Sequence, residues 1–518
     1  MAQGTVNFSE RAARLIDSLI EPWAPARVRR RMAERMALNE MRQYDAAARG
    51  RRTDGWRRTG SSADREVRGA IKGLRNGSRE LVRNNKFAAA ALRQMTANVV
   101  GDGITARMTH PNKAIAKRAQ AEWDRWAESR IDGREDHYGQ QKLLFRSIAE
   151  GGEGLAVWAP GPSGPDERCF IMEGDLLDDT KEADRLPNGG RIVQGVEYDS
   201  DGMRVAYWLF DKHPGDLTGY HGTSKRFEAA HVDHVFESLR PGQTRGVSWF
   251  APVAMTLRDG ADYADAILMK RKVEACLALV LTPPESGEPT GPFSEAKGEG
   301  SGTGGGKAEG SRRGGEQIRP GMVFRARPGE TATTLNPSSG GDGTEFYRQE
   351  LKGVSANLVP YFLMTGDPSQ SNYSSQRALM LGFWANLDDW QWNMMVPQFC
   401  KPAVERRMRW LAARTGDRRF LDVKPDFAMP VRRLLDPGKD LAALERELRL
   451  GVVSYPAMLS QRGIDPEAHI KAMKDFYEMA DKAGIVFDGD PRRTARSGSL
   501  QAPVGYIRPR EDDADSED

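Results

Sequence analysis

The chain has 518 residues, of which 39% are hydrophobic, and a formal net charge of +3 at pH 7. This length allows roughly three to four domains, and the composition allows buried cores. The three cysteines, Cys169, Cys276 and Cys400, are far apart and form no CxxC pair, which argues against a disulfide framework and fits a reducing compartment.

Charge is unevenly distributed along the chain. The first hundred residues contain 21 Lys and Arg but only 10 Asp and Glu, whereas the final nine, REDDADSED, contain six acids and one Arg. A basic front and an acidic tail indicate a charged surface or a nucleic-acid partner near the front. A solvated Arg-rich helix explains the front equally well.

The first half of the chain begins with helical patterns. Residues 1–59 form a basic N-terminal region that reads as an Arg-rich helix, and two better-patterned helices follow over 64–100. The glycines of GDG at 101–103 suit a helix end. Residues 113–158 also have a helical pattern, so we expect helix there.

Short alternating runs separated by turn dipeptides over residues 165–240 predict an antiparallel β-rich module. A helical pattern then extends over 251–281 and would span about 45 Å. Because much of its surface is polar, this helix suits a rod that packs against copies of itself. Its apolar end, near 275–281, is far shorter than the ~20 residues a membrane helix needs, and no apolar signal segment follows Met1. We therefore expect a soluble, intracellular protein without a membrane partner.

The Gly/Ser-rich insertion at 284–319 predicts a flexible segment. Its glycines precede Lys307, but Ser301 and Ala308 break the pattern of a phosphate-binding loop, so no ATP site is expected. Strands are predicted over 320–337 and helices over 344–364 and 373–414.

Pro397 and Pro402 are expected to bend or break the second of these helices. Shorter helices are predicted over about 430–485, and a polar tail follows them.

The sequence offers little catalytic chemistry. Four histidines lie between 213 and 234, but they form no HExxH motif and are interpreted as surface residues of the β-rich module. Helical acids at 259, 262 and 265 have no second acidic cluster to complete a Mg²⁺ site, and GVSWF lacks the second glycine of a nucleophile elbow. We expect no catalytic residues, no metal and no cofactor.

Four stretches, in order, resemble the lambda-type portal proteins of tailed bacteriophages. They are YDAAARGRRTDGW (44–56), LVRNNKFAAAALRQMTANVVGDGI (81–104), the segment from HVFESLRPGQTRG into the following long helix (234–282), and VPYFLMTGDPSQSNYSSQRALML (359–381). The resemblance covers roughly residues 40–480. The insertion at 284–319 is its main departure.

The resemblance implies an α+β, mainly helical portal fold assembled as a cyclic ring. The expected parts are a wing, a helical stem, an α/β clip and a helical crown. Their expected boundaries are: basic region 1–59, wing 60–137, stem helix 138–164, clip 165–240, long stem helix 241–283, flexible insertion 284–319, wing with tunnel loop (366–374) and long helix 320–400, crown 401–485, and acidic tail 486–518.

The implied function is a non-enzymatic ring, usually a dodecamer, at one capsid vertex of the virion, assembled in the host cytoplasm. Double-stranded DNA would pass through it without sequence specificity during packaging and ejection. The implied partners are terminase, major capsid and scaffolding proteins, and head-tail connector proteins. Two alternatives stay open: another head-tail connector or baseplate ring protein, or a DNA-processing enzyme.

The tunnel loop would contribute Asp367, Ser369, Gln370, Ser371, Asn372 and Tyr373 to the DNA channel. Weak, reversible hydrogen bonds and a repulsive carboxylate would let DNA slide, whereas Lys or Arg would hold phosphates. The loop could equally be an ordinary helix start capped by Asn372 or Ser374. A set of basic residues could contact DNA or form ion pairs between subunits, and the sequence does not decide between these roles. The set is Arg27, Arg29, Arg30, Arg31, Lys270, Arg271 and Lys272.

Overall fold

The computed structural model divides into two compact units, residues 1–62 and 63–518. It describes scattered residues between 23 and 55 and then residues 60–276, apart from 162–163 and 217–221. Two strands follow at 280–282 and 331–333, and the last described part is 343–492 apart from 370–371, 433–435, 463, 465, 488–489 and 491. The insertion predicted at 284–319 lies outside the described residues.

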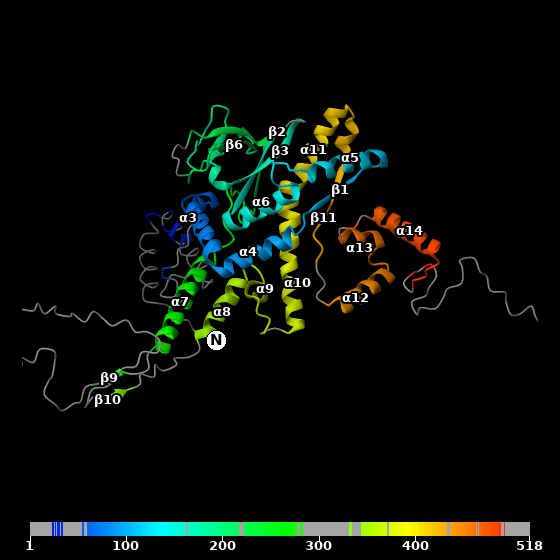
Figure 1. The fold of residues 1–518 in the computed structure, drawn as a ribbon. Coiled ribbons are helices and arrows are strands. Elements are labelled where there is room, and N and C mark those ends of the chain that lie inside the picture. Colours follow the sequence, from blue (N-terminus) through cyan, green and yellow to red (C-terminus); the bar gives the residue numbers. More distant parts are fainter. Residues whose placement is uncertain are drawn as a thin grey trace, which may run out of the picture. The chain divides into compact units, whose positions relative to one another are not determined.

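Helices account for most of the regular structure in the described part of the second unit (Figure 1). Their bounds are α3 Ala63–Asn84, α4 Lys86–Val99, α5 Lys113–Ala127, α6 His137–Gly151, α7 Ala254–Cys276, α8 Gly343–Ser355, α9 Tyr361–Thr365, α10 Tyr373–Asp389, the π-helix η5 Trp390–Cys400, α11 Lys401–Thr415, α12 Pro437–Arg449, α13 Tyr455–Gln461 and α14 Pro466–Ala483. Short 3₁₀ turns are η3 Gly174–Leu176, η4 Ala229–His231 and η6 Arg418–Asp422. None of these helices is long and apolar enough to cross a lipid bilayer.

The strands form small antiparallel sheets. Their bounds are β1 Thr105–Thr109, β2 Glu153–Gly161, β3 Gly164–Glu173, β4 Arg191–Val193, β5 Val196–Tyr198, β6 Arg204–Leu209, β7 Lys225–Glu228, β8 Val232–Phe236, β9 Val280–Thr282, β10 Thr331–Thr333 and β11 Lys424–Ala428. The two larger sheets have the orders β3-β2-β8 and β4-β5-β6-β7. The β-rich character predicted for 165–240 is confirmed.

Among the described residues, the larger apolar core joins α4, α5 and α6 to the helices from α8 to α11 and to β2 and β3. A smaller cluster lies between the two larger sheets and includes Leu155 and Tyr207. The two-stranded sheet of β1 and β11 ties residues more than 300 positions apart, with Thr105 opposite Ala428. The fold is therefore α+β and mainly helical, as predicted.

The helical prediction for residues 153–158 is wrong, as is the extension of a stem helix to residue 164. Helix α6 ends at Gly151, because Gly152 adopts a left-handed conformation with φ of 95°. The following run from Glu153 to Trp158 is wholly buried as strand β2, the centre of a three-stranded sheet. A short apolar run of this kind is compatible with a buried helix or a buried strand. The segments that pack against it determine which of the two forms.

The helix predicted over 373–414 contains Pro397 and Pro402 and does not break at either. From Tyr373 to Thr415 the chain is continuously helical, and Figure 1 shows α10 and α11 as one yellow rod. Pro397 lies inside the π-helix η5, and Pro402 lies in the first turn of α11. A proline removes one backbone donor and collides with the preceding turn, and the wider π-turn accommodates both effects.

Candidate channel loop and its supporting contacts

The polar loop at 366–374 begins at a left-handed glycine. Gly366, with φ of 73°, ends α9, and its amide donates to the carbonyl of Phe362. The Asp367 carboxylate then accepts the backbone N–H of Ser369 at 3.0 Å, which forms a local turn. Gln370 and Ser371 lie outside the described residues.

The loop ends in a reciprocal cap on α10. Asn372 Oδ1 accepts the backbone N–H of Ser375 at 2.8 Å, and the Ser375 hydroxyl accepts the backbone N–H of Asn372 at 3.0 Å. Of the two capping residues considered from sequence, Asn372 is the cap. This motif satisfies helix donors that would otherwise need water and sets the direction in which the chain enters α10.

The loop carries negative charge. Hydrogen bonds from the side chain and backbone of Ser369 lower the pKa of Asp367, so its carboxylate is ionised at neutral pH. Ser369, Asn372 and Tyr373 are exposed. The stretch from Gly366 to Ser375 contains no Lys or Arg.

Two basic residues hold the start of α10 against α12. Arg377 donates to the Asp440 carboxylate at 2.7 Å and to the Tyr373 hydroxyl at 3.1 Å. Lys439 Nζ lies 5.0 Å from the centre of the Tyr373 ring. Tyr373, predicted as a loop residue, is thus the first residue of α10 and contacts Lys439 of α12.

The basic candidates lie in two separate parts of the chain, residues 27–31 and 270–272. Arg27 and Arg29 lie outside the described part, and Arg30 forms an exposed pair with Glu34 at 3.2 Å. Arg31 is helical in the first unit. Lys270, Arg271 and Lys272 are exposed near the end of α7. Their DNA and intersubunit interpretations both stay open.

A buried charge cluster, absent from the sequence predictions, lies where α6, β2 and β8 meet. Glu153 is fully buried, and Arg245 Nε lies 3.0 and 2.9 Å from its two carboxylate oxygens. Arg75, from α3, donates to Glu153 Oε1 at 2.6 Å. The backbone N–H of Gly246 also donates to Glu153, at 3.1 Å. We call Glu153, Arg245, Arg75 and His234 the buried charge cluster.

Two protonation states follow from this geometry. Burial opposes ionisation of Glu153, but Arg245, the hydrogen bond from His234 and Arg75 hold the pKa of its carboxyl well below its ordinary value. Burial lowers the pKa of His234 despite its contact with Glu153 at 2.9 Å. A neutral His234 therefore donates from Nε2 to the carboxylate. Its burial corrects the prediction that these histidines are surface residues; His221 lies outside the described residues.

Helix α3 carries a row of basic residues whose partners come from residues 173–182. Lys72 pairs with Asp179 at 2.9 Å, and Arg79 donates to Glu173 at 2.7 Å and Asp175 at 2.6 Å. Arg68 pairs with Glu182 on the same side. Part of the basic excess at the front of the chain is thus neutralised within the subunit.

One group of potential metal ligands occurs among the described residues: Glu173, Asp175 and His213. The guanidinium of Arg79 already donates to both carboxylates. A cation would have to compete with that bound positive charge, so we assign no metal role to the group.

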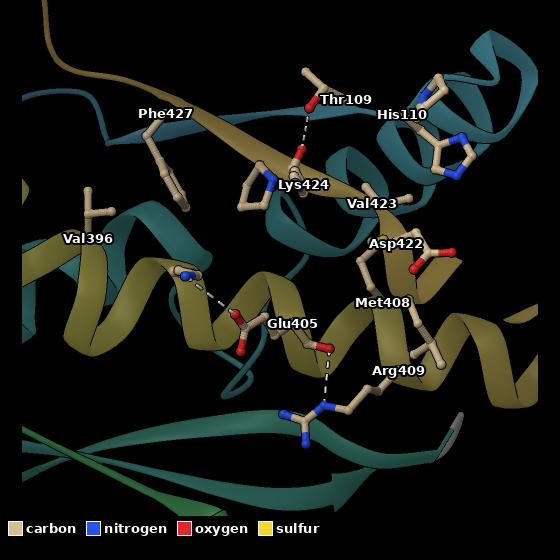
Figure 2. Close-up of a pocket in the computed structure, with 14 residues that line it drawn as sticks. Thr109, His110, Val396, Glu405, Met408, Arg409, Asp422, Val423, Lys424 and Phe427 are labelled. Atoms are coloured by element: carbon tan, nitrogen blue, oxygen red, sulfur yellow. Dashed lines mark hydrogen bonds and ion pairs between the residues drawn. The ribbon is translucent and has the colours of Figure 1, made fainter. Parts of the chain in front are cut away.

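A groove with a volume of about 1590 Å³ runs between the β1–β11 sheet and α11. Figure 2 shows Phe427 and Lys424 on one side of it and Glu405, Met408 and Arg409 on the other. Apolar side chains and both signs of charge alternate along its lining.

A match to a known protein family identifies the family of this chain. Residues 49–391 match the family described as phage portal protein, lambda family. The chain belongs to the lambda family of phage portal proteins. Members of this family are structural components of phage particles, and they act as ring-forming homo-oligomers. The match contains the candidate channel loop, the buried charge cluster and all of α7.

Individual relatives are more distant. A probable portal protein of Halomonas phage phiHAP-1 is 28% identical over 243 residues, which cover 44% of this chain and 47% of that protein. The chain thus matches about half the length of this curated relative. Among solved structures, the neck of an empty GTA particle computed with C6 symmetry is 13% identical, covers 80% of this chain and 96% of its own, and has a TM-score of 0.40. An HK97 family portal protein from Corynebacterium diphtheriae is 11% identical. The match covers 70% of this chain and 97% of that protein's chain, with a TM-score of 0.30.

Proposed function

We propose that this portal subunit assembles as a dodecameric ring at one capsid vertex and lets double-stranded DNA pass during packaging and ejection. The observation that carries this proposal is the loop at 366–374, a polar and anionic segment within the family match. Each phosphate that a protein neutralises adds to a salt-dependent attraction for DNA. A loop without Lys or Arg offers no such contact, so the duplex is free to slide.

The loop geometry supports a narrow role for each described residue. Asp367 presents one ionised carboxylate per subunit and repels phosphates. Ser369 and Asn372 offer neutral hydrogen bonds. Tyr373 is held by Arg377 and Lys439, so the end of the loop has a defined position on the rod of α10. Gln370 and Ser371 complete the proposed channel surface.

The expected division of the chain is part of the same proposal. Residues 60–137 and 320–400 form the wing, α6 and α7 the stem, 165–240 the clip, and 401–485 the crown. The clip then binds terminase during packaging and head-tail connector proteins afterwards. Capsid and scaffolding proteins surround the ring, which assembles in the host cytoplasm. The seven basic candidates at 27–31 and 270–272 contact DNA or neighbouring subunits.

Two rival functions give different results in solution. Another connector or baseplate protein would also form rings but would bind no terminase. A DNA-processing enzyme would turn over DNA in the presence of Mg²⁺ or ATP. The geometry does not favour the enzyme, because among the described residues Arg79 already donates to both carboxylates of the potential metal group.

Electron microscopy of the purified full-length chain tests the assembly. We expect closed rings with a central channel wide enough for duplex DNA, and native mass spectrometry should give the mass of twelve subunits. Added scaffolding protein serves as the control for assembly that needs a partner. Particles with no central hole, or with one too narrow for a double helix, would contradict the proposed function.

Reversing the charge of the loop should make DNA adhere. In Asp367→Lys rings, each phosphate that a new lysine neutralises should steepen the dependence of log binding constant on log salt by about 0.9. We expect stronger duplex retention at low salt and slower packaging, measured by filter binding and by DNase protection. Asp201→Lys makes the same charge change on an exposed turn between β5 and β6 and should leave both readouts near wild type. Equal effects from the two variants would count against a channel position for the loop.

A further inference from the structure

A small cavity lies beside β8, the outer strand of the sheet β3-β2-β8. Its volume is about 320 Å³, far more than one water molecule needs. Arg204 of β6, Ser238 and Gln398 of η5 line it together with residues of β8. The side chain of Gln398 holds both backbone polar groups of Phe236 at 3.1 Å, so this wall of the cavity has a fixed position.

One side chain of the lining is buried with only one of its two ring nitrogens bonded. His234 is 7% exposed, and its Nε2 contacts the Glu153 carboxylate at 2.9 Å. Its Nδ1 is buried and has no hydrogen-bond partner. Because the proton of the neutral ring is on Nε2, Nδ1 is an acceptor. Buried polar atoms of folded proteins nearly always have a partner, so the cavity is where a donor for Nδ1 belongs.

A second group of the lining is a cation without a counter-ion. Arg204 is half-buried, and its guanidinium carbon lies 5.3 Å from the centre of the Phe236 ring. Its polar neighbours are the phenol groups of Tyr198 and Tyr207. Among the described residues no carboxylate pairs with it. Since a charge that is withdrawn from water needs a counter-ion, Arg204 favours an anion in the cavity.

The carboxylates near the cavity are already paired. Asp233 accepts from Arg406 at 2.7 Å on each of its oxygens, and Glu153 is held by Arg245. Arg204 is therefore the guanidinium of this group that has no carboxylate partner in the described part of the chain. The charged and titratable groups around His234 are Glu153, Asp233, Arg75, Arg204, Arg245, Arg406 and Tyr207.

A carboxylate group satisfies both unmet groups at once. Its planar pair of oxygens matches the guanidinium of Arg204, and the Phe236 ring offers apolar contact to the carbon that carries it. A carboxylate oxygen meets Nδ1 of His234 only with a proton between them, because two acceptors repel each other. A water molecule would donate to Nδ1 but would leave the charge of Arg204 without a counter-ion.

We propose that the cavity lined by Arg204, His234, Phe236 and Ser238 binds a carboxylate group together with one proton from solvent. We call it the carboxylate cavity. The proton lies between the ligand oxygen and Nδ1, while Nε2 keeps its hydrogen bond to Glu153. The ligand is either a small free carboxylate or an Asp or Glu side chain of a bound protein. This binding activity goes beyond the passage of DNA, and it acts where β6, β8 and η5 meet.

Saturation-transfer NMR on the methyl signal of acetate tests the cavity in the full-length chain. We expect saturable binding at pH 6.5. In Arg204→Gln the Kd should rise about tenfold or more, because a charge-assisted hydrogen bond is lost. Ser238→Ala changes an exposed side chain and should also weaken binding. The control Lys225→Gln removes the same charge from an exposed position of β7 and should keep the wild-type Kd. Circular dichroism checks that each variant folds.

The pH dependence separates this cavity from an ordinary anion site. Because binding takes up one proton, the Kd of acetate should rise about tenfold for each pH unit above pH 6.5. A Kd that does not change with pH, equal competition by chloride, or wild-type binding by both Arg204→Gln and Ser238→Ala would overturn the inference.

A blocked Gly-Glu-Gly peptide distinguishes the two sources of the carboxylate. Tighter binding of the peptide than of acetate supports an acidic side chain of a partner protein as the ligand. Tighter binding of acetate supports a small free carboxylate. Binding of neither probe would overturn the inference and would leave the proposed ring and its channel untouched.

Discussion

The Arg245→Met variant is expected to lose about 3–5 kcal/mol of subunit stability, because it leaves the buried Glu153 carboxylate without its main partner. Arg245 is 1% exposed, and besides Glu153 it donates to the carbonyls of Gln194 at 3.1 Å and Gly174 at 2.8 Å. Removing it therefore leaves Glu153 with Arg75 as its remaining charged partner in the cluster and takes a donor from two carbonyls. Denaturant unfolding of the subunit, followed by far-ultraviolet circular dichroism, measures the loss.

A second arginine of the same short motif supplies the control. Arg240 pairs with Glu66 at 2.8 Å, but both side chains are about half exposed. An exposed pair contributes at most ~1 kcal/mol, so Arg240→Met should change stability little. Similar losses in the two variants would show that the buried charge cluster is not what this motif stabilises.

The cluster gives a physical reason for a part of the sequence that resembles the family most clearly. In RPGQTRG, Thr244 binds Asp64 through its backbone at 2.7 Å, and Gln243 donates to the carbonyl of Arg245 at 2.7 Å. Gly246 has no room for a side chain, since a Cβ there would lie 2.0 Å from the carbonyl oxygen of Gly152. The motif thus joins α3, the end of α6 and β2 before α7 begins.

Much of the helical framework could be predicted, because its signals are local. Apolar residues at helical spacing predicted α3 and α4, and Asn85 caps α4 as its side chain accepts the Phe87 amide at 2.9 Å. Strand β2 could not be predicted, since its neighbours β3 and β8 decide its state, and β8 lies about eighty residues away. The π-helix was missed for a similar reason. Pro397 alone predicts a helix break. The neighbouring Gln398, however, makes a long-range contact: its side chain accepts the backbone N–H of Phe236 and donates to the carbonyl of Phe236, both at 3.1 Å.

In the candidate site, too, the features with local sequence signals could be predicted and the long-range contacts could not. Its loop was recognisable from a run of turn-forming and capping residues, and Asn372 does cap α10. The contact of Arg377 with Asp440 spans 63 positions, and that of Arg75 with Glu153 spans 78. Charge counts alone could not show that basic residues of α3 face acids of the β-rich module. Glu153, which directly precedes the apolar run of GLAVW, was a local signal that a buried acid would need a basic partner.

A buried histidine makes the stability of the subunit depend on pH. His137, the first residue of α6, is fully buried, and neither ring nitrogen has a hydrogen-bond partner. Its ring stacks on Phe399 with centres 5.3 Å apart and meets Trp123 edge-on at 5.2 Å. Desolvation lowers the pKa of His137 to about 3, so the folded subunit holds this ring neutral.

Acidification should therefore begin to destabilise the subunit below pH 6.5, the ordinary pKa of a histidine. Below pH 6.5 the unfolded chain binds a proton at His137 that the folded chain excludes. The free energy of unfolding therefore falls by about 1.4 kcal/mol for each pH unit, down to about pH 3. At pH 4.5 the loss is ~2.7 kcal/mol relative to neutral pH, measured by denaturant unfolding across a pH series. His137→Phe keeps the aromatic packing and should reduce this slope, leaving the contribution of the buried His234, whose pKa burial also lowers. His231→Gln changes an exposed ring and should keep the wild-type slope. An unchanged slope in His137→Phe would mean that the folded protein admits the proton, through water entering the aromatic cluster or through local opening of α6.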